Sequence, residues 1–459
     1  MDPAIVAIII LSYISLITII GIYFSKKAKS SEGFFLADRS LGWLTLAATI
    51  TATTVGGSAT IVAGGRIYAQ GLPALWYDIG GALGLIVLGL FIAKKVRKTG
   101  LFTLPDITGQ LYDKKVRTAS AVLILITEIA WISLLIQAAS LILQVVLPIQ
   151  YEILLVIITI GFIMYTLIGG QYAVVYTDII QFFVMIIGIC IIAAPLLFIK
   201  ALPNISQLSN VSLSFPINSN IGFLAAGSIF IMMFMPHIVG PDIYSKILSA
   251  KNEKEARKGA LFSGFFKFIF AIAIGLIAIS ALVLFPGLEN AYVAIPTAVF
   301  SLSPVIAGIV LAAFVSVMLS SADSCLLSAG TILSIDIFKK KNVNISRFGI
   351  LVIGIVALLL ALYVTNLEKI IGFSGILKTL QIAYTIFTAG LILPILFGFY
   401  KEKTKVTSKG AFFSLLLGGS ISLIWLNFAS QPYSEYAVLV GLGVSIIPLL
   451  LFRENSSTN

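Results

Sequence analysis

Charged residues, histidine and cysteine are scarce in this sequence. Only 11% of its 459 residues are charged and 59% are hydrophobic, with a mean hydropathy of +1.08; an average soluble domain is about 25% charged. One histidine and two cysteines are too few for a His-rich metal site, a haem pair or an iron–sulfur cluster, and they imply no disulfide framework. The composition excludes most metalloenzymes, predicts no cofactor and indicates a polytopic membrane protein.

About thirteen apolar stretches are long enough to cross a hydrocarbon core of ~30 Å. They predict an all-α protein with about 13 transmembrane helices embedded in the lipid bilayer. The stretches cover residues 4–24, 43–68, 74–93, 119–147, 151–169, 176–199, 220–243, 260–285, 296–335, 347–366, 370–400, 409–428 and 434–452.

The net charge of +11 reflects membrane topology and predicts no nucleic acid partner. Most Lys and Arg residues fall in alternate loops between the stretches, and Lys246 counts among these loop charges. The positive-inside rule places such loops in the cytoplasm, so we expect the N-terminus outside and the C-terminus inside the plasma membrane. The basic loops are residues 26–39, 94–117, 246–258, 339–347 and 401–409, followed by Arg453.

Two of the apolar stretches contain residues that disfavour a continuous helix. Residues 51–65 are rich in glycine and β-branched residues, and residues 234–242 contain Pro236, Gly240 and Pro241. Glycines that merely allow close helix packing are the alternative interpretation. Helices interrupted at corresponding places in two halves are typical of inverted-repeat secondary transporters, which bind their solute at the midplane between the breaks.

Oxygen-bearing side chains form one face of the segment 311–336. A carboxylate inside a membrane is costly unless it is paired, hydrated or near a cation, so the acid on this face marks a functional site. Hydroxyl, carboxylate and unwound-helix carbonyl oxygens together suit an alkali or similar hard cation. The face consists of Ser320, Ser321, Asp323, Ser324, Ser328 and Thr331.

Four segments, in this order, resemble the sodium:solute symporter family, which includes carriers of proline, pantothenate, choline, sugars and sialic acid. They are residues 34–42 (FFLADRSLG), the break at 51–65, residues 169–181 (GGQYAVVYTDIIQ) and residues 320–324 (SSADS). The resemblance implies the leucine-transporter type of fold with a five-plus-five inverted repeat. Its two halves would be residues 43–199 and 220–400, preceded by a helix and cytoplasmic loop in 1–42 and followed by two helices and a short tail in 401–459.

The resemblance also implies sodium as the coupling ion and a main sodium site. That site would use the backbone carbonyls of Ala52, Val55 and Val317 with the hydroxyls of Ser320 and Ser321.

A second cation site, which some members of the family have, would lie near Asp178, Asp323 and Ser324. Asp323 stands where such members have a hydroxyl, so a second ion, a proton or no ion at all remain open for this sequence. Thr54 stands where proline carriers have an aspartate.

The solute is expected between the two breaks. A half-helix N-terminus there would attract a negative group, so we expect an amino acid such as proline, or a small carboxylate such as pantothenate, ahead of choline, which needs an aromatic cage. The candidate solute-binding residues are Thr54, Gly56, Trp131, His237, Gln381 and Tyr384.

Other classes of membrane protein fit the sequence less well. It has no phosphate-binding loop of an ATP-driven pump, only one segment that faintly resembles a potassium filter, and no spacing that joins its few intramembrane acids into an enzyme site. We therefore predict a sodium-coupled symporter that imports a small organic solute by alternating access and is not an enzyme. The alternatives are a proton-coupled carrier of the same fold and a non-transporting solute sensor; the sequence indicates no oligomeric state.

Overall fold

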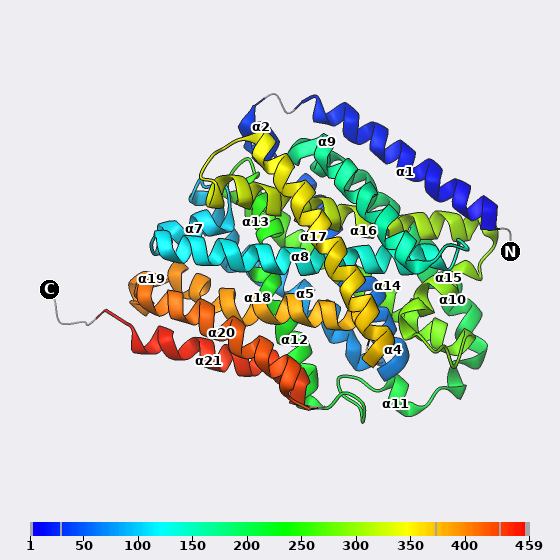
Figure 1. The fold of residues 1–459 in the computed structure, drawn as a ribbon. Helices are drawn as coiled ribbons and strands as arrows, with labels where there is room; N and C mark the ends of the chain where they lie inside the picture. The colour runs from blue at the N-terminus through cyan, green and yellow to red at the C-terminus, as the bar shows by residue number, and fades with distance from the viewer. Residues whose placement is uncertain (1–2, 28–29, 372–373, 431–432, 455–459) are drawn as a thin grey trace.

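The described part of the chain is built from helices that lie roughly along one long axis. The computed structural model describes residues 3–27, 30–371, 374–430 and 433–454, and these residues form helices and no strand. The first helix, α1 (Pro3–Ser25), begins at one end of the molecule, and the last, α21 (Ala437–Leu451), ends at the opposite end (Figure 1). The predicted all-α class is confirmed.

The expected number of about 13 membrane-spanning helices is not confirmed. In the described ranges, eleven helical segments are long and apolar enough to span a membrane, and one bent pair raises the number to twelve. One of the eleven, Tyr151–Gln207, has 57 residues, and at 1.5 Å per residue it would be roughly 85 Å long, more than twice the hydrocarbon thickness. This segment contains the two stretches that the sequence separates, 151–169 and 176–199.

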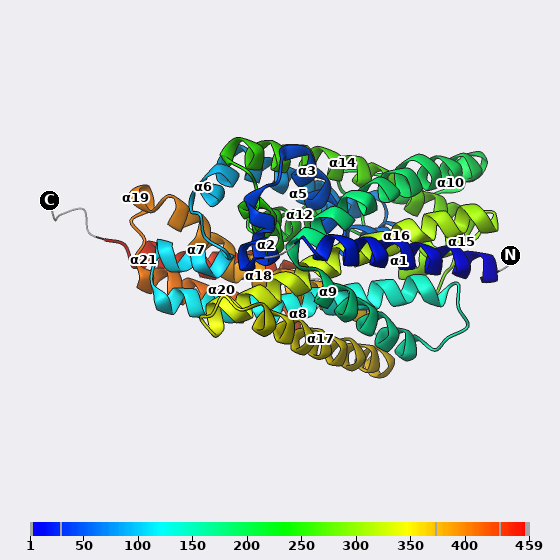
Figure 2. The ribbon, with the colours of Figure 1, turned by 90° about the horizontal axis from the view of Figure 1, so that it is seen from above.

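The long segment folds back on itself within α9 (Tyr151–Met185). Gly170 has φ 64° and ψ −178°, a conformation that no helix contains. Tyr165 and Thr177 both lie within 4 Å of the same point beside Gly21, although a straight helix would place them roughly 18 Å apart. Figure 2 shows the start of α9 and α10 (Ala194–Ala201) reaching the same end of the molecule.

The first predicted break is confirmed. α3 (Trp43–Thr54) ends before Val55, and the chain resumes as a helical segment, Ser58–Gln70, whose axis is bent by 62° from that of α3. A Cβ atom on Gly56 would lie 2.8 Å from the Ser321 hydroxyl. Glycine is therefore needed at Gly56 because the broken backbone approaches the neighbouring helix so closely.

The second predicted break is also present, but Pro236 does not cause it. α12 (Phe223–Ile238) continues through Pro236, and the helix stops at Val239 and Gly240 before α13 (Pro241–Leu248) begins. A proline leaves the carbonyl four residues earlier without its helical partner. That carbonyl, on Met232, accepts a hydrogen bond from the Thr388 hydroxyl at 3.4 Å, which explains why α12 tolerates the proline.

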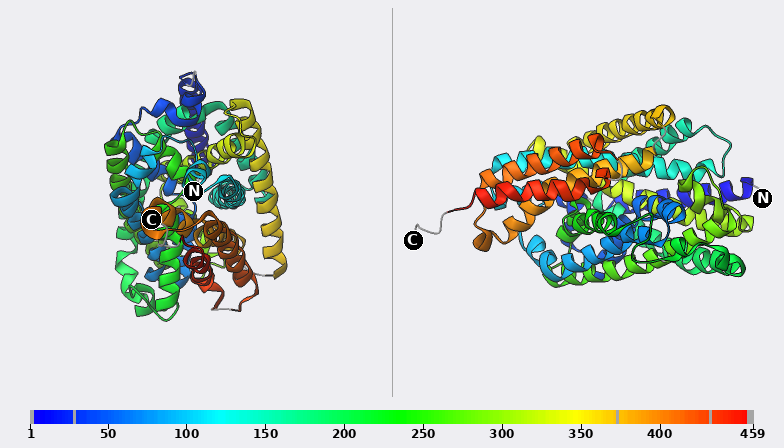
Figure 3. Two further views of the ribbon diagram at one scale, coloured as in Figure 1. Left: turned by 90° about the vertical axis from the view of Figure 1, so that its left-hand side faces the viewer. Right: turned by 90° about the horizontal axis from the view of Figure 1, so that it is seen from below.

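α16 (Pro304–Ile332) is the central helix of the described structure. In the most apolar part of the segment Pro304–Ile337, which contains α16, 83% of the residues are buried. The corresponding fraction for α1 is 22%. The oxygen-bearing face of α16 is therefore surrounded by protein and not by lipid. Figure 3 shows α20 (Ser408–Phe428) and α21 at the periphery, on the side opposite α1.

The remaining helices complete the bundle and its connections. They are α2 (Ser31–Leu36), α4 (Ala63–Gln70), α5 (Trp76–Val87), α6 (Ala93–Lys98), α7 (Leu104–Leu111), α8 (Lys114–Gln144), α11 (Asn210–Leu213), α14 (Glu253–Leu284), α15 (Ala294–Phe300), α17 (Val343–Ile371), α18 (Gly375–Phe399) and α19 (Lys401–Thr404).

The close packing of α5 on α12 gives a first prediction. A Cβ atom on Gly84 would lie 2.3 Å from the carbonyl oxygen of Phe234 and 2.8 Å from the Cβ of His237. Gly84→Ala should therefore lower the free energy of unfolding by about 1–3 kcal/mol, the usual cost of overpacking. Gly227→Ala is the control because a Cβ there has no neighbour within 4 Å. Equal melting temperatures for the two variants in detergent would contradict this packing.

Candidate functional site

The carbonyl end of α3 meets the middle of α16. The Ser320 hydroxyl donates to the carbonyl oxygen of Ala52 at 2.9 Å and lies 3.2 Å from that of Val317, its own helix neighbour. The Ser321 hydroxyl donates to the carbonyl oxygen of Thr53 at 2.8 Å. The last carbonyls of a helix lack helical partners and carry a partial negative charge. The junction between α3 and α16 therefore attracts cations.

The predicted sodium ligands lie at or beside this junction. Ala52, Val317, Ser320 and Ser321 meet there directly, and Val55 is the first residue of the break, fully buried. Their oxygens are uncharged carbonyls and hydroxyls, which suit a hard cation. Within the described ranges no three His, Cys, Asp or Glu residues come together as metal ligands, so nothing here points to a transition-metal centre.

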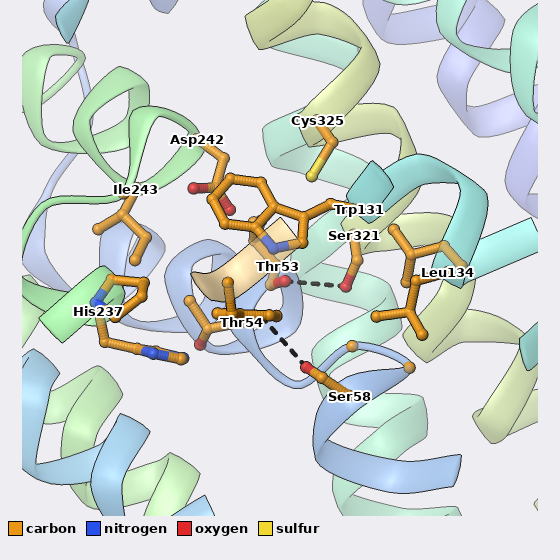
Figure 4. A pocket seen from close by; sticks show the side chains of 16 residues that line it. Thr53, Thr54, Ser58, Trp131, Leu134, His237, Asp242, Ile243, Ser321 and Cys325 are labelled. Carbon is orange, nitrogen blue, oxygen red and sulfur yellow. Dashed lines mark hydrogen bonds between the residues drawn. The ribbon is translucent and has the colours of Figure 1, made fainter. Parts of the chain in front are cut away.

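A cavity lies next to the junction, between the two breaks (Figure 4). Ser321 belongs to its wall, so the cavity and the predicted sodium site share a side chain. Five of the six predicted solute-binding residues line it: Thr54, Gly56, Trp131, His237 and Tyr384.

Aromatic rings and one carboxylate line the cavity. The ring centroid of Trp131, on α8, lies 5.3 Å from that of Tyr384, on α18. The Tyr384 hydroxyl lies 3.3 Å from the Ser58 hydroxyl. Asp242, in the first turn of α13, lines the same cavity as Trp131 (Figure 4). The described lining residues include this carboxylate but no lysine or arginine.

Two predicted residues have other surroundings than the sequence suggests. Gln381 does not line this cavity; one turn before Tyr384, its side chain faces a separate cavity beside Arg66 and Glu435. His237 does line the solute cavity, but its Nδ1 lies 2.6 Å from the carbonyl oxygen of Met233 in its own helix. That nitrogen is therefore already engaged.

Lys267 is a site residue that the sequence reasoning missed. Its Nζ donates to the carbonyl oxygen of Thr54 at 2.6 Å and lies 3.8 Å from Oδ1 of Asp78 on α5, and both charged side chains are buried. A positive charge at a helix C-terminus is favourable, so Lys267 stabilises the end of α3. A lysine and an aspartate inside apolar stretches were a usable signal, because ionisable residues in a membrane are functional candidates.

The residues of the predicted second cation site lie in one buried cluster that includes a lysine. Oδ2 of Asp178 accepts hydrogen bonds from the Thr49 hydroxyl and from Nζ of Lys246, the latter at 3.0 Å. The Ser324 hydroxyl lies 3.0 Å from that of Thr53 and 3.3 Å from Oδ1 of Asp323.

The assignment of Lys246 to a cytoplasmic loop is wrong. Its side chain is fully buried, because the interrupted span continues through α13 as far as Leu248. Ending the apolar stretch at residue 243 placed this lysine outside the membrane, although it belongs to the second half of a broken helix.

The sequence is similar to those of known proteins. The sequence profile of the sodium:solute symporter family matches residues 34–418. The sodium/glucose cotransporter of Vibrio parahaemolyticus is 27% identical over 92% of this chain and 85% of its own length. The human high affinity choline transporter 1 is 27% identical over 77% and 67%.

A solved structure shows the same fold. The substrate-bound, outward-open state of a Na⁺-coupled sialic acid symporter superposes with a TM-score of 0.77 over 97% of both chains, at 18% sequence identity. This likeness concerns the arrangement of helices.

Proposed function

The chain belongs to the sodium:solute symporter family, and from this premise we propose that it imports a small organic solute with a positively charged nitrogen, coupled to sodium, by alternating access. It is a sodium-coupled transporter and not an enzyme. The observation that supports the solute class best is the Asp242 carboxylate, which lines the cavity between the two broken helices together with Trp131.

The proposed main sodium site is formed by the carbonyls of Ala52, Val55 and Val317 with the hydroxyls of Ser320 and Ser321. The contacts at 2.9 and 2.8 Å between α16 and the last turn of α3 support it. Sodium there ties α3 to α16. Because both helices also border the solute cavity, sodium raises the affinity for the solute, and the solute raises the affinity for sodium by the same factor.

The solute class follows from the charge and shape of the cavity. The half-buried carboxylate of Asp242 attracts a positive charge, and aromatic faces attract a cation as well. An amino acid such as proline fits through its ammonium group. A quaternary amine also fits, because Trp131 and Tyr384 supply the aromatic faces that such a cation needs. Both residues lie on unbroken helices next to the cavity. A small carboxylate such as pantothenate ranks behind both, since its charge would face Asp242.

The proposed orientation has the N-terminus outside and the C-terminus in the cytoplasm of the cell that carries the protein in its plasma membrane. The basic helices α6 and α19 lie at the end of the molecule where α21 ends, which supports this orientation (Figures 1 and 2). Residues 43–199 and 220–400 remain the proposed inverted halves, each with one broken helix.

Thermal unfolding of the purified protein tests the proposal. Proline, choline, glucose and pantothenate are compared in sodium and in potassium. A ligand that binds only the folded protein at a hundredfold excess over its Kd stabilises it by about 2.7 kcal/mol. We expect stabilisation by proline or choline in sodium only. Stabilisation by glucose or pantothenate alone would contradict the solute class, and equal shifts in both salts would favour a proton-coupled carrier or a sensor.

A substitution of Asp242 tests the role of its carboxylate. Asp242→Asn should weaken binding of the nitrogen-bearing solute roughly tenfold or more, the usual loss for a hydrogen bond to a charged group. Cys325→Ala is the matched control, because this residue lines the same cavity without a charge. Solute titrations measure both affinities. An unchanged affinity in Asp242→Asn would remove Asp242 from the site.

A further inference from the structure

A lysine lies in the cluster where a second cation site was one of the open alternatives. Lys246 Nζ lies 3.0 Å from Oδ2 of Asp178, the carboxylate around which such a site would form. Thr49, Asp178 and Lys246 are fully buried and Asp323 is 1% exposed. These four residues come from four different helices, α3, α9, α13 and α16. The cluster therefore forms only when these helices pack together.

The geometry points to Lys246 as a built-in cation, and we propose that it takes the place of a second sodium ion, so that the chain binds one sodium ion per solute. This inference deepens the proposed function and rests on the main sodium site at Ser320 and Ser321. A sodium ion bound to the Asp178 carboxylate would lie within a few ångströms of the Lys246 ammonium group. Two positive charges that close together in a buried site repel strongly.

The surrounding oxygens support a cation position and not a simple ion pair. Oδ1 of Asp178, Oδ2 of Asp323 and the side-chain oxygen of Gln181 are buried and have no hydrogen-bond partner among the described residues. Asp323 also interacts electrostatically with both Asp178 and Lys246. The ammonium group hydrogen-bonds Oδ2 of Asp178, and removing it would leave a group of hard oxygen ligands that suit sodium.

The test needs sodium alone, without solute. Thermal unfolding of the purified full chain is measured as sodium replaces potassium at constant ionic strength. Near saturation, stabilisation rises with the logarithm of the sodium concentration in proportion to the number of ions bound. The wild type should show the slope of one ion. Lys246→Gln should be less stable in potassium and should show the slope of two ions in sodium.

Two further variants identify the second ion. Lys246→Arg retains the charge and should keep the wild-type slope. Lys246→Gln combined with Asp178→Asn removes both the lysine and the ligand, so the second ion should be lost. Introducing Ser320→Ala and Ser321→Ala into Lys246→Gln should remove only the main site and leave one ion. Failure of the proposed main site is therefore distinguishable from failure of this inference.

Several results would overturn the proposal. A two-ion slope in the wild type would do so, as would a folded Lys246→Gln protein with the wild-type slope. If Lys246→Gln does not fold, Asp178→Asn alone decides the question. The proposal expects this variant to keep the one-ion slope, because Lys246 still excludes sodium, whereas a slope one ion smaller than that of the wild type would show that Asp178 binds sodium.

Discussion

Combining Ser320→Ala with Ser321→Ala is expected to raise the sodium concentration for half-maximal solute uptake by about 100-fold or more. Both hydroxyls contact the carbonyl end of α3, and both belong to the proposed sodium ligands. A hydrogen bond to a charged group contributes about 1.5–3 kcal/mol, so losing two oxygen ligands of similar strength has an effect of at least this size. Sodium titrations of uptake into proteoliposomes measure it.

A matched control is available on the same helix. Thr331 is buried, and its hydroxyl donates to the Leu327 carbonyl of its own helix. Thr331→Ala should therefore keep the wild-type sodium curve at equal protein incorporation. If the double serine variant also kept the wild-type curve, the sodium site would have to be placed elsewhere.

Lys267→Met is expected to lower the free energy of unfolding by roughly 3–5 kcal/mol, the usual cost of removing one partner of a buried ion pair. The substitution leaves the Asp78 carboxylate without its cation and removes the donor to the Thr54 carbonyl at 2.6 Å. Unfolding in detergent, followed by circular dichroism, measures the loss.

A second substitution separates the lost charge from lost packing. Lys267→Met combined with Asp78→Asn should recover much of the stability, since the unpaired carboxylate is gone. Lys254→Met, at an exposed lysine of the same helix, should have little effect. If the combined variant were no more stable than Lys267→Met, the unpaired Asp78 carboxylate would not be the cause of the lost stability.

The sequence predicted those features that depend on local chemistry. Low charge and long apolar stretches predicted the all-α membrane class. The glycines near Gly56 predicted the first broken helix. The spacing of Ser320 and Ser321 placed both hydroxyls on one helix face. The structure brings them to the carbonyl end of α3, while their role as sodium ligands stays a prediction.

Features that depend on distant partners were not predictable. Pro236 was expected to break its helix, but Thr388, from another helix, satisfies the carbonyl that the proline frees. Trp131 and Tyr384 lie far apart in the sequence, so the sequence did not show that their rings pack against each other. This aromatic pair favours a cationic solute. Lys246 was counted as a loop charge because charge patterning cannot show where a broken helix ends.

The proposed stoichiometry sets an upper limit on solute accumulation. With a tenfold sodium gradient and no membrane potential, coupling to one ion concentrates an uncharged solute at most about tenfold, whereas two ions would allow about a hundredfold. A lysine in place of the second ion thus limits accumulation and keeps the charge of the buried cluster fixed during transport.

The most direct measurement is the coupling between sodium and solute in the purified protein. The solute Kd is measured without sodium and at saturating sodium, and the sodium Kd without solute and at saturating solute. Coupling through the α3–α16 junction predicts the same factor in both directions, about tenfold or larger, and its loss in the Ser320→Ala and Ser321→Ala protein. A solute Kd that is identical in sodium and in potassium would contradict sodium coupling at this site.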